Sequence, residues 1–167
     1  LYGKLSYTTG NPVFMRDTNA LAGDNGVDRT IRVGKIRGDI EFKNVGFSYE
    51  EGKEVLQGIT FSAPAGSVTA LVGTSGSGKT TIAGLAATFL TPKSGQILLD
   101  GIDLSKVNLE SYRSQLGVVL QDDFLFEGTI RENILFPRPG ASTHELEQAV
   151  RAAYVHEFSD RFENGLD

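Results

Sequence analysis

Apolar and polar positions alternate most regularly between residues 40 and 49, where the sequence reads Ile-Glu-Phe-Lys-Asn-Val-Gly-Phe-Ser-Tyr. A period near two predicts a strand with one face against the core and the other in water, as in an antiparallel sheet. Residues 50–53 have the composition of a polar turn, and residues 55–61 continue in strand-forming residues. The pattern therefore predicts an antiparallel pair of strands.

Two further stretches are almost wholly apolar. Residues 67–72 read Ser-Val-Thr-Ala-Leu-Val, and residues 117–120 read Gly-Val-Val-Leu. Short β-prone runs without alternation are typical of parallel strands that are buried on both faces. A Gly/Ser loop follows the first run, and a helix-forming stretch follows the loop at residues 80–90. We therefore predict a buried strand, a loop and a helix in that order.

Turn and capping signals place the next elements. Residues 96–104 predict a hairpin, because the Asp-Gly pair at 100–101 separates two apolar runs. Asn108 is placed to cap a short helix that extends to Gln115.

The two ends of the chain differ from its middle. Residues 1–37 show neither period, and we expect a linker or extended arm there, ahead of a folded part at residues 38–167. Ser142 and Glu145 have the spacing of a capping box that opens a helical segment from about residue 141. The apolar face of that helix consists of Leu146, Ala149, Val150 and Ala153.

The composition excludes several classes of protein. A chain of 167 residues, 40% hydrophobic and 22% charged, has the size and make-up of one globular domain. The absence of cysteine excludes disulfides and thiolate zinc sites, and two histidines disfavour a multi-histidine metal site. A net charge of −5 gives no reason to expect a nucleic-acid partner. No apolar run reaches the roughly 18 residues of a membrane span, so we expect no direct membrane insertion by this segment.

Three of the 20 glycines lie within one motif, two of them at its fixed positions. Residues 73–80 read Gly-Thr-Ser-Gly-Ser-Gly-Lys-Thr and match G-x-x-x-x-G-K-[ST] throughout. Glycines lack a Cβ, so this loop can curl until its backbone N–H groups point at phosphate oxygens. The N-terminus of the predicted helix adds further N–H donors and a positive dipole end. The motif predicts a phosphate-binding cradle.

The side chains of the cradle suit a nucleotide and its metal. Lys79 supplies a full positive charge to the β- and γ-phosphates, and the Thr80 hydroxyl can coordinate Mg²⁺. Thr81 can hydrogen-bond another phosphate oxygen. The candidate nucleotide-binding residues of the cradle are Gly73, Thr74, Ser75, Gly76, Ser77, Gly78, Lys79, Thr80 and Thr81.

Hydrolysis also needs a group that organises metal and water, usually beside a neighbouring apolar strand. Asp100 follows such a run, but it stands in the predicted turn of a hairpin. Asp122 is better placed, because the apolar run 117–120 leads into it. On spacing alone, Asp122 remains a candidate metal-site acid, and otherwise Asp122 and Asp123 are loop residues.

Five segments together resemble the nucleotide-binding domain of ABC transporters of the exporter subfamily. They are residues 40–49, the cradle at 73–81, Ser-Gly-Gln-Ile-Leu-Leu-Asp-Gly at 94–101, Leu-Gly-Val-Val-Leu-Gln at 116–121 and Phe-Leu-Phe-Glu-Gly-Thr-Ile-Arg-Glu-Asn-Ile at 124–134. The resemblance covers about residues 38–167. It implies an α/β fold in which a P-loop NTPase core of parallel strands and helices carries an antiparallel β-subdomain.

The resemblance implies roles for two residues that spacing leaves open. Tyr49 matches the A-loop aromatic residue that stacks on adenine. Gln121 matches the Q-loop glutamine, which contacts Mg²⁺ and the hydrolytic water, so Thr80 and Gln121 would be the metal ligands. Lys79 and Gln121 are then the candidate catalytic residues, and Asp122 loses its candidacy. The cofactors implied are ATP and Mg²⁺.

Three catalytic motifs of the family do not occur in the sequence. They are the Leu-Ser-Gly-Gly-Gln signature, a second apolar strand that ends in Asp-Glu, and a switch histidine, which neither His144 nor His156 matches. We therefore expect the N-terminal part of such a domain, truncated before the signature. An intact parent of this family is an ATP hydrolase, whereas the 167-residue chain is expected to hold ATP without turnover.

The resemblance also implies partners and a location. Two nucleotide-binding domains pair head to tail in this family and drive the transmembrane domain of an exporter, on the cytoplasmic side of a membrane. Two alternatives remain open on the residues: a standalone P-loop kinase or GTPase that uses Asp122, and a non-catalytic regulatory module that binds nucleotide as a structural ligand.

Overall fold

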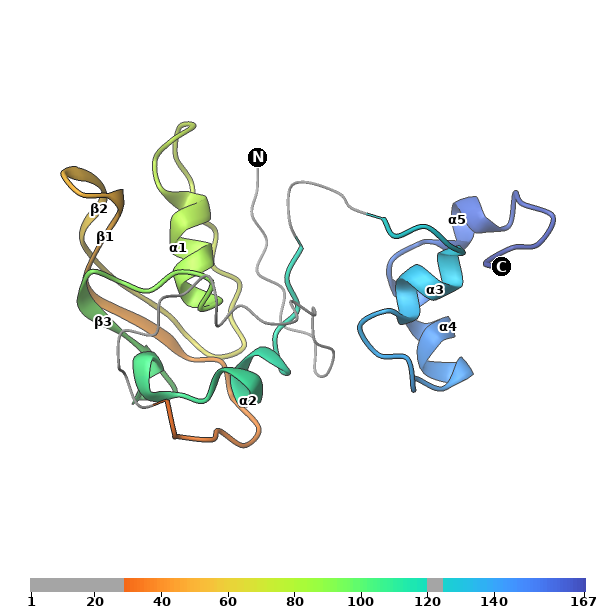
Figure 1. The fold of residues 1–167 in the computed structure, drawn as a ribbon, viewed down its shortest axis with the longest axis horizontal. Coiled ribbons are helices and arrows are strands. Elements are labelled where there is room, and N and C mark those ends of the chain that lie inside the picture. The colour runs from red at the N-terminus through yellow and green to blue at the C-terminus, as the bar shows by residue number, and fades with distance from the viewer. Residues whose placement is uncertain (1–28, 120–124) are drawn as a thin grey trace. The chain divides into compact units, whose positions relative to one another are not determined.

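A computed structural model describes residues 29–119 and 125–167. The chain divides into two compact units, Leu1–Gln121 and Asp122–Asp167 (Figure 1). Gln121, Asp122 and Asp123, three residues of the predicted site region, lie outside the described residues.

The first unit is built on an antiparallel sheet of the order β2-β1-β3-β4. β1 (Ile40–Glu50) and β2 (Lys53–Ala63) form the predicted hairpin, and β3 (Ser94–Leu99) pairs with the other edge of β1. β4 (Ile102–Asp103) completes the second predicted hairpin across the turn at Asp100 and Gly101. Both hairpin predictions are confirmed. They could be made from the sequence because short connections and alternating side chains specify a hairpin locally.

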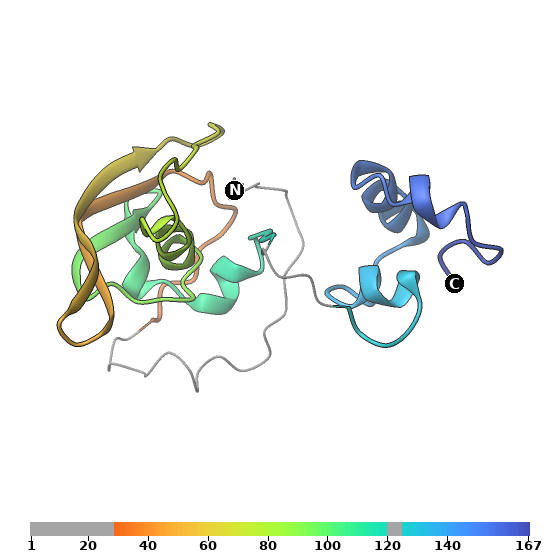
Figure 2. The same cartoon turned by 90° about the horizontal axis from the view of Figure 1, so that it is seen from above.

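The core of the first unit lies between one face of this sheet and helix α1 (Lys79–Ala86), around which the sheet curves (Figure 2). Phe42 and Phe61 stack across β1 and β2 with ring centroids 4.6 Å apart. α1 is shorter than the predicted helix at residues 80–90, since the chain turns at Thr88, whose φ is +61°. The buried core residues that the sheet and α1 contribute are Phe42, Val45, Phe47, Leu56, Leu85, Ala86, Ile97 and Leu99.

Gly78 lets the start of α1 approach the sheet closely. A Cβ at this position would lie 2.5 Å from Leu56 Cδ2 of β2, well inside van der Waals contact. Gly78 also has a φ of +84°, in the left-handed region that favours glycine. This position therefore requires glycine for two reasons, its backbone conformation and its packing.

Helix α2 (Leu109–Arg113), capped by Asn108 as predicted, follows the 3₁₀ turn η2 (Leu104–Lys106). Tyr112 is fully buried, and its hydroxyl donates to the Ala86 carbonyl over 2.8 Å. Burial, together with the negative charge of Asp100, raises the pKa of Tyr112. The hydroxyl consequently remains a donor and ties α2 to the end of α1.

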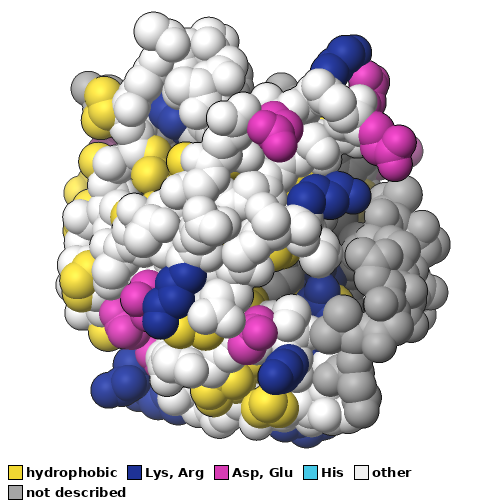
Figure 3. All heavy atoms as spheres, turned by 90° about the vertical axis from the view of Figure 1, so that its left-hand side faces the viewer, with side chains coloured by type: hydrophobic (Ala, Val, Ile, Leu, Met, Phe, Trp, Pro, Cys, Tyr) yellow, Lys and Arg dark blue, Asp and Glu magenta, His cyan; other side chains and the backbone are white. Residues whose placement is uncertain are grey.

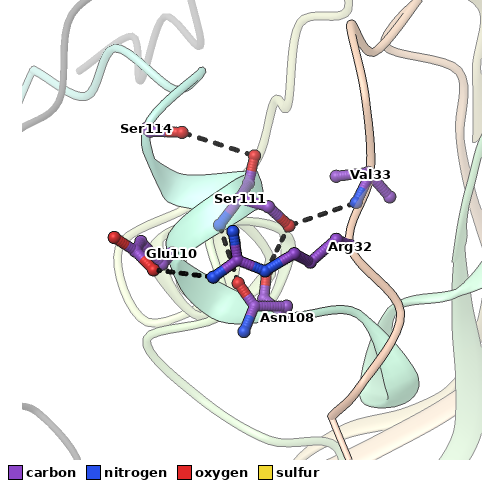
Figure 4. Close-up of polar contacts among 6 residues, drawn as sticks. All are labelled: Arg32, Val33, Asn108, Glu110, Ser111 and Ser114. Atoms are coloured by element: carbon purple, nitrogen blue, oxygen red, sulfur yellow. Dashed lines mark hydrogen bonds and ion pairs between the residues drawn. The ribbon is translucent and has the colours of Figure 1, made fainter.

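Residues 31–36 run beside residues 106–115, and we call the hydrogen-bonded contact between them the seam. Ile31 forms a parallel bridge with Val107 at the start of the seam. Further along, the Val33 N–H donates to Ser111 Oγ over 3.2 Å, as Figure 4 shows. Arg32 and Glu110 form an exposed ion pair at 3.5 Å beside this contact (Figure 4). The chain ahead of β1 is thus fixed to α2.

Gln115 closes the seam with its side-chain amide. Its Oε1 accepts from the Ile36 N–H at 3.0 Å, and its Nε2 donates to the Gly34 carbonyl at 2.8 Å. The same Nε2 lies 2.8 Å from the Ser111 carbonyl. One side chain therefore pairs with the backbone of two segments that are about 80 residues apart in sequence.

Asp100 continues this attachment into β1. Its carboxylate accepts from the N–H groups of Arg37 and Asp39, at 2.7 and 2.9 Å. The residue has a φ of +50° and stands in the tight turn, as predicted. Since both carboxylate oxygens are used by the backbone, Asp100 acts as a structural residue.

The prediction of a buried strand at residues 67–72 is wrong. The segment forms no strand, and Val68 and Val72 are 84% and 86% exposed. Residues 117–119 also form no strand, and Val119 is 79% exposed. A strand needs a hydrogen-bonded neighbour, and the sheet in the described part of the chain offers none to either run. β-propensity alone does not supply a partner.

The second unit contains three short helices, α3 (Ile130–Leu135), α4 (Thr143–Ala152) and α5 (His156–Ser159), in its described residues. Capping boxes open α3 and α4, and the one that begins α4 at Ser142 confirms the prediction. The predicted apolar face of α4 is only half right, because Leu146 and Val150 are buried whereas Ala149 and Ala153 are exposed. The buried face of α4 therefore consists of two residues one turn apart, Leu146 and Val150.

The surfaces of the described residues carry charges of both signs. The face of the first unit in Figure 3 shows Lys and Arg side chains interspersed with Asp and Glu. On β1, Lys43 pairs with Glu41 at 3.2 Å, and across the hairpin turn Lys53 pairs with Glu50 at 2.6 Å. No helix within residues 29–119 and 125–167 is long and apolar enough to cross a membrane.

The packing of Gly78 on Leu56 predicts an asymmetry between two glycines of the cradle. Gly76 has a φ of +80°, close to that of Gly78, but a Cβ there would meet nothing within 4 Å. Both Gly→Ala substitutions carry the left-handed cost of about 1–2 kcal/mol, and Gly78→Ala should lose about 1–3 kcal/mol more through the clash.

Urea unfolding measures this difference, with Gly76→Ala as the matched control. Adding Leu56→Ala to Gly78→Ala removes the clash, so the double variant should lose less than the two single losses combined. Equal losses for Gly76→Ala and Gly78→Ala would contradict the packing.

The seam predicts that Gln115→Leu, which keeps the size of the side chain, lowers the free energy of unfolding by about 1–2 kcal/mol, because it removes the hydrogen bonds to residues 34 and 36. Ser114→Ala is the control, since Ser114 Oγ makes only a long 3.4 Å contact with the Ser111 carbonyl one turn away. Chemical denaturation compares the two variants, and a loss for Gln115→Leu no greater than that of the control would refute the role of the seam.

Candidate nucleotide-binding site

The predicted cradle forms an exposed loop that leads directly into α1. Residues 73–77 are exposed, and Gly78 is the N-cap of the helix. No side chain caps this helix end, and its first turn contains no acidic residue. The first N–H groups of α1 are therefore available to an anion, as the glycine motif predicts.

Lys79 lies across its own loop. Its Nζ donates to the carbonyls of Gly73 and Thr74 over 3.0 and 2.6 Å, and to Ser77 Oγ over 3.2 Å. The Ser77 N–H in turn donates to the Thr74 carbonyl over 3.2 Å. The three ammonium hydrogens of Lys79 are thus used by oxygens of its own loop. To bind a phosphate, Lys79 has to exchange these contacts for phosphate oxygens.

Tyr49 reaches this loop from the sheet. It stands near the end of β1, and its hydroxyl is 3.1 Å from Thr81 Oγ1 in the first turn of α1. Its ring meets the Phe47 ring edge to face, with centroids 4.9 Å apart and an interplanar angle of 88°. The residue is 62% exposed, so the ring presents open surface beside the cradle. The structure thus brings a residue singled out by resemblance next to residues singled out by a motif.

Two residues near the site had no prediction. Phe47 supports the Tyr49 ring, and its position two residues earlier on β1 is the signal that could have placed both on one face. Leu56 contacts Gly78, but nothing in the pattern of a strand indicates which residue meets a distant glycine.

Thr80 is the cradle residue that was predicted to bind Mg²⁺. No group of three or more His, Asp or Glu side chains that could hold an ion occurs in residues 29–119 and 125–167. Thr80 is an exposed hydroxyl beside Lys79. One hydroxyl suits Mg²⁺, which usually takes one or two protein ligands and completes its shell with phosphate oxygens and water.

The remaining candidates lie elsewhere or outside the described residues. Gln121 and Asp122 belong to the part that the structure does not describe. His144 and His156 are in the second unit, where His144 Nε2 lies 3.0 Å from Gln148 Nε2 on the surface of α4. Arg131 pairs with Asp167, and this bond raises the pKa of Arg131 and lowers that of Asp167.

Comparisons with known proteins agree with this geometry. The family model described as ABC transporter matches residues 56–165. A Bacillus subtilis protein titled "Uncharacterized ABC transporter ATP-binding protein YknV" is 51% identical over 124 residues, which are 74% of this chain and 20% of that protein. The "Fatty acid ABC transporter ATP-binding/permease protein" of Mycobacterium tuberculosis is 45% identical over 131 residues, 78% of this chain and 20% of the relative.

A solved structure shares the fold. It is titled "Structure of a bacterial Atm1-family ABC exporter with ATP bound", and it matches with a TM-score of 0.72 and 41% identity over 78% of this chain and 23% of that chain. This chain therefore spans only about a fifth of the length of the relatives that it matches. The family match covers the cradle, β3, β4 and β2 from Leu56 onward, and together with the solved structure it confirms the ABC-ATPase fold class. The chain belongs to the ABC transporter family, as part of an ATP-binding domain of the exporter type.

Proposed function

We propose that this chain binds ATP together with Mg²⁺ as part of the ATPase domain of an ABC exporter. The observation that supports the proposal most is the uncapped start of α1 at Gly78 and Lys79, with Tyr49 hydrogen-bonded to Thr81 in the same first turn. A helix start with no side-chain cap and a lysine in its first turn favours a phosphate chain, and an exposed aromatic ring beside it favours a flat base. The two features together describe a nucleoside triphosphate.

Each part of the nucleotide has its own residues in this proposal. Lys79 and the loop backbone, from Gly73 to Gly78, hold the β- and γ-phosphates, and Thr81 contacts another phosphate oxygen. Tyr49 stacks on adenine. Thr80 and Gln121 hold Mg²⁺, whose charge would offset that of the phosphates.

The partners proposed are those of the exporter relatives. One relative carries the printed name "ATP-binding/permease protein", which joins an ATP-binding part to a membrane part in one protein. We propose that an intact parent pairs two such domains head to tail, couples hydrolysis to movement of a transmembrane domain, and works on the cytoplasmic side of a membrane. Residues 1–37 would then be the linker from that domain.

The first prediction from this site concerns affinity. Lys79→Ala should weaken ATP binding about 10- to 150-fold, because it removes a charged hydrogen bond worth about 1.5–3 kcal/mol. Isothermal titration with Mg-ATP measures the change. Lys35→Ala, at another exposed lysine ahead of β1, is the control and should leave the affinity unchanged. Equal affinity for Lys79→Ala and the unaltered chain would refute the proposed site.

The second prediction concerns turnover and base choice. The 167-residue chain should bind ATP but show no steady ATP hydrolysis, because the signature and the catalytic glutamate of the family are absent from its sequence. Phosphate release is the assay, and turnover that Lys79→Ala abolishes would contradict this expectation.

Tyr49→Ala should weaken the binding of ATP but not that of inorganic triphosphate. Tight GTP binding that is indifferent to Tyr49→Ala would instead favour a GTPase.

A further inference from the structure

We infer that Thr81 is a positioning residue for Tyr49, and that its hydroxyl joins the base-binding ring to the phosphate cradle. This inference rests on the proposed function, because it concerns how one ATP molecule is held at both ends. It goes beyond that function by assigning the hydroxyl groups of Tyr49 and Thr81 a role in each other's action.

The Tyr49 ring is restrained at two points. Its hydroxyl lies 3.1 Å from Thr81 Oγ1, and its side meets the Phe47 ring at a centroid distance of 4.9 Å. Phe47 is buried, and Thr81 is only 4% exposed, so both restraints belong to the packed part of the unit. A side chain with two rotatable bonds that is held by its hydroxyl and by a neighbouring ring loses little further freedom when a base stacks on it.

A second contact fixes the sheet against the start of α1 near the Tyr49–Thr81 hydrogen bond. Leu56 of β2 packs against Gly78, and Tyr49 of β1 bonds Thr81, three residues later. The strands that carry Tyr49 and Leu56 are paired antiparallel over the same stretch. These two contacts therefore set the distance between the Tyr49 ring and the cradle. One ATP molecule can contact both only if this distance matches the separation of its base from its phosphates.

The hydrogen-bonding capacity of the two hydroxyls allows both contacts at once. A threonine hydroxyl carries one hydrogen and two lone pairs. When Tyr49 O–H donates to Thr81 Oγ1, the Thr81 hydrogen is left for a phosphate oxygen, which only accepts. The chain of contacts then runs from the base through Tyr49 and Thr81 to the phosphates, and charge on the phosphate strengthens such bonds.

A double-mutant cycle on the 167-residue chain tests the inference, with Mg-ATP and inorganic triphosphate as probes. Tyr49→Phe keeps the ring and removes the hydroxyl, so ATP affinity should fall about 2- to 10-fold, with triphosphate affinity unchanged. Thr81→Val keeps the shape and should weaken both probes. In the Thr81→Val background, Tyr49→Phe should change ATP affinity less than about 2-fold, because the partner hydroxyl is already absent.

Two controls separate positioning from general damage. Thr81→Ser keeps the hydroxyl and should restore the dependence of ATP affinity on the Tyr49 hydroxyl. Tyr154→Phe, at an exposed tyrosine of the second unit, should leave both affinities unchanged. Thermal unfolding of each variant establishes that the chain is folded when its affinity is measured.

The outcomes distinguish this inference from the function on which it rests. An equal loss for Tyr49→Phe with and without the Thr81 hydroxyl would overturn the inference, as would an ATP affinity that Tyr49→Phe does not change. If Tyr49→Ala still weakened ATP in that case, the proposed function would stand without it. An unaltered chain that binds neither probe would overturn both.

Discussion

The close approach of α1 to the antiparallel sheet is the constraint on which the site depends. Gly78 contacts Leu56 where any larger residue would clash, and this contact puts the helix start beside the ends of β1 and β2. Without that approach the loop at residues 73–78 could still curl around Lys79, but Tyr49 would have no fixed place beside it. The local motif makes a phosphate site, and the packing of Gly78 makes it part of a nucleotide site.

The seam is a second long-range contact of the first unit, after the packing of Gly78 on Leu56, and it joins residues 31–36 to residues 106–115. Residues 31–36 are held by backbone bonds at Ile31 and by the side chains of Ser111 and Gln115. Asp100 continues the contact into the start of β1. Tyr112 of α2 also bonds the end of α1. Neighbouring residues of α2, Ser111 and Tyr112, therefore hold both residues 31–36 and α1.

Sequence patterns predicted the parts of this structure that are decided locally. The hairpins follow from alternation and an Asp-Gly corner, and the caps at Asn108 and Ser142 follow from side chains that bond their own helix starts. The strand at residues 67–72 was wrong, because pairing depends on a neighbour that propensity does not specify. The sequence motif predicted the cradle, whereas only the family resemblance pointed to Tyr49. Its bond to Thr81, across 32 residues, has no signature in the sequence, and neither has the contact of Leu56 with Gly78.

In the proposed function, Tyr49 and the cradle hold the two ends of one ATP molecule. Intermolecular nuclear Overhauser effects between the chain and Mg-ATP test it most directly, because they report protons within about 5 Å of one another. Effects are expected between the Tyr49 ring protons and adenine H2 or H8, together with large shifts of the backbone amides of residues 74–80. Shifts of those amides with adenine contacts to other residues, and none to Tyr49, would contradict it.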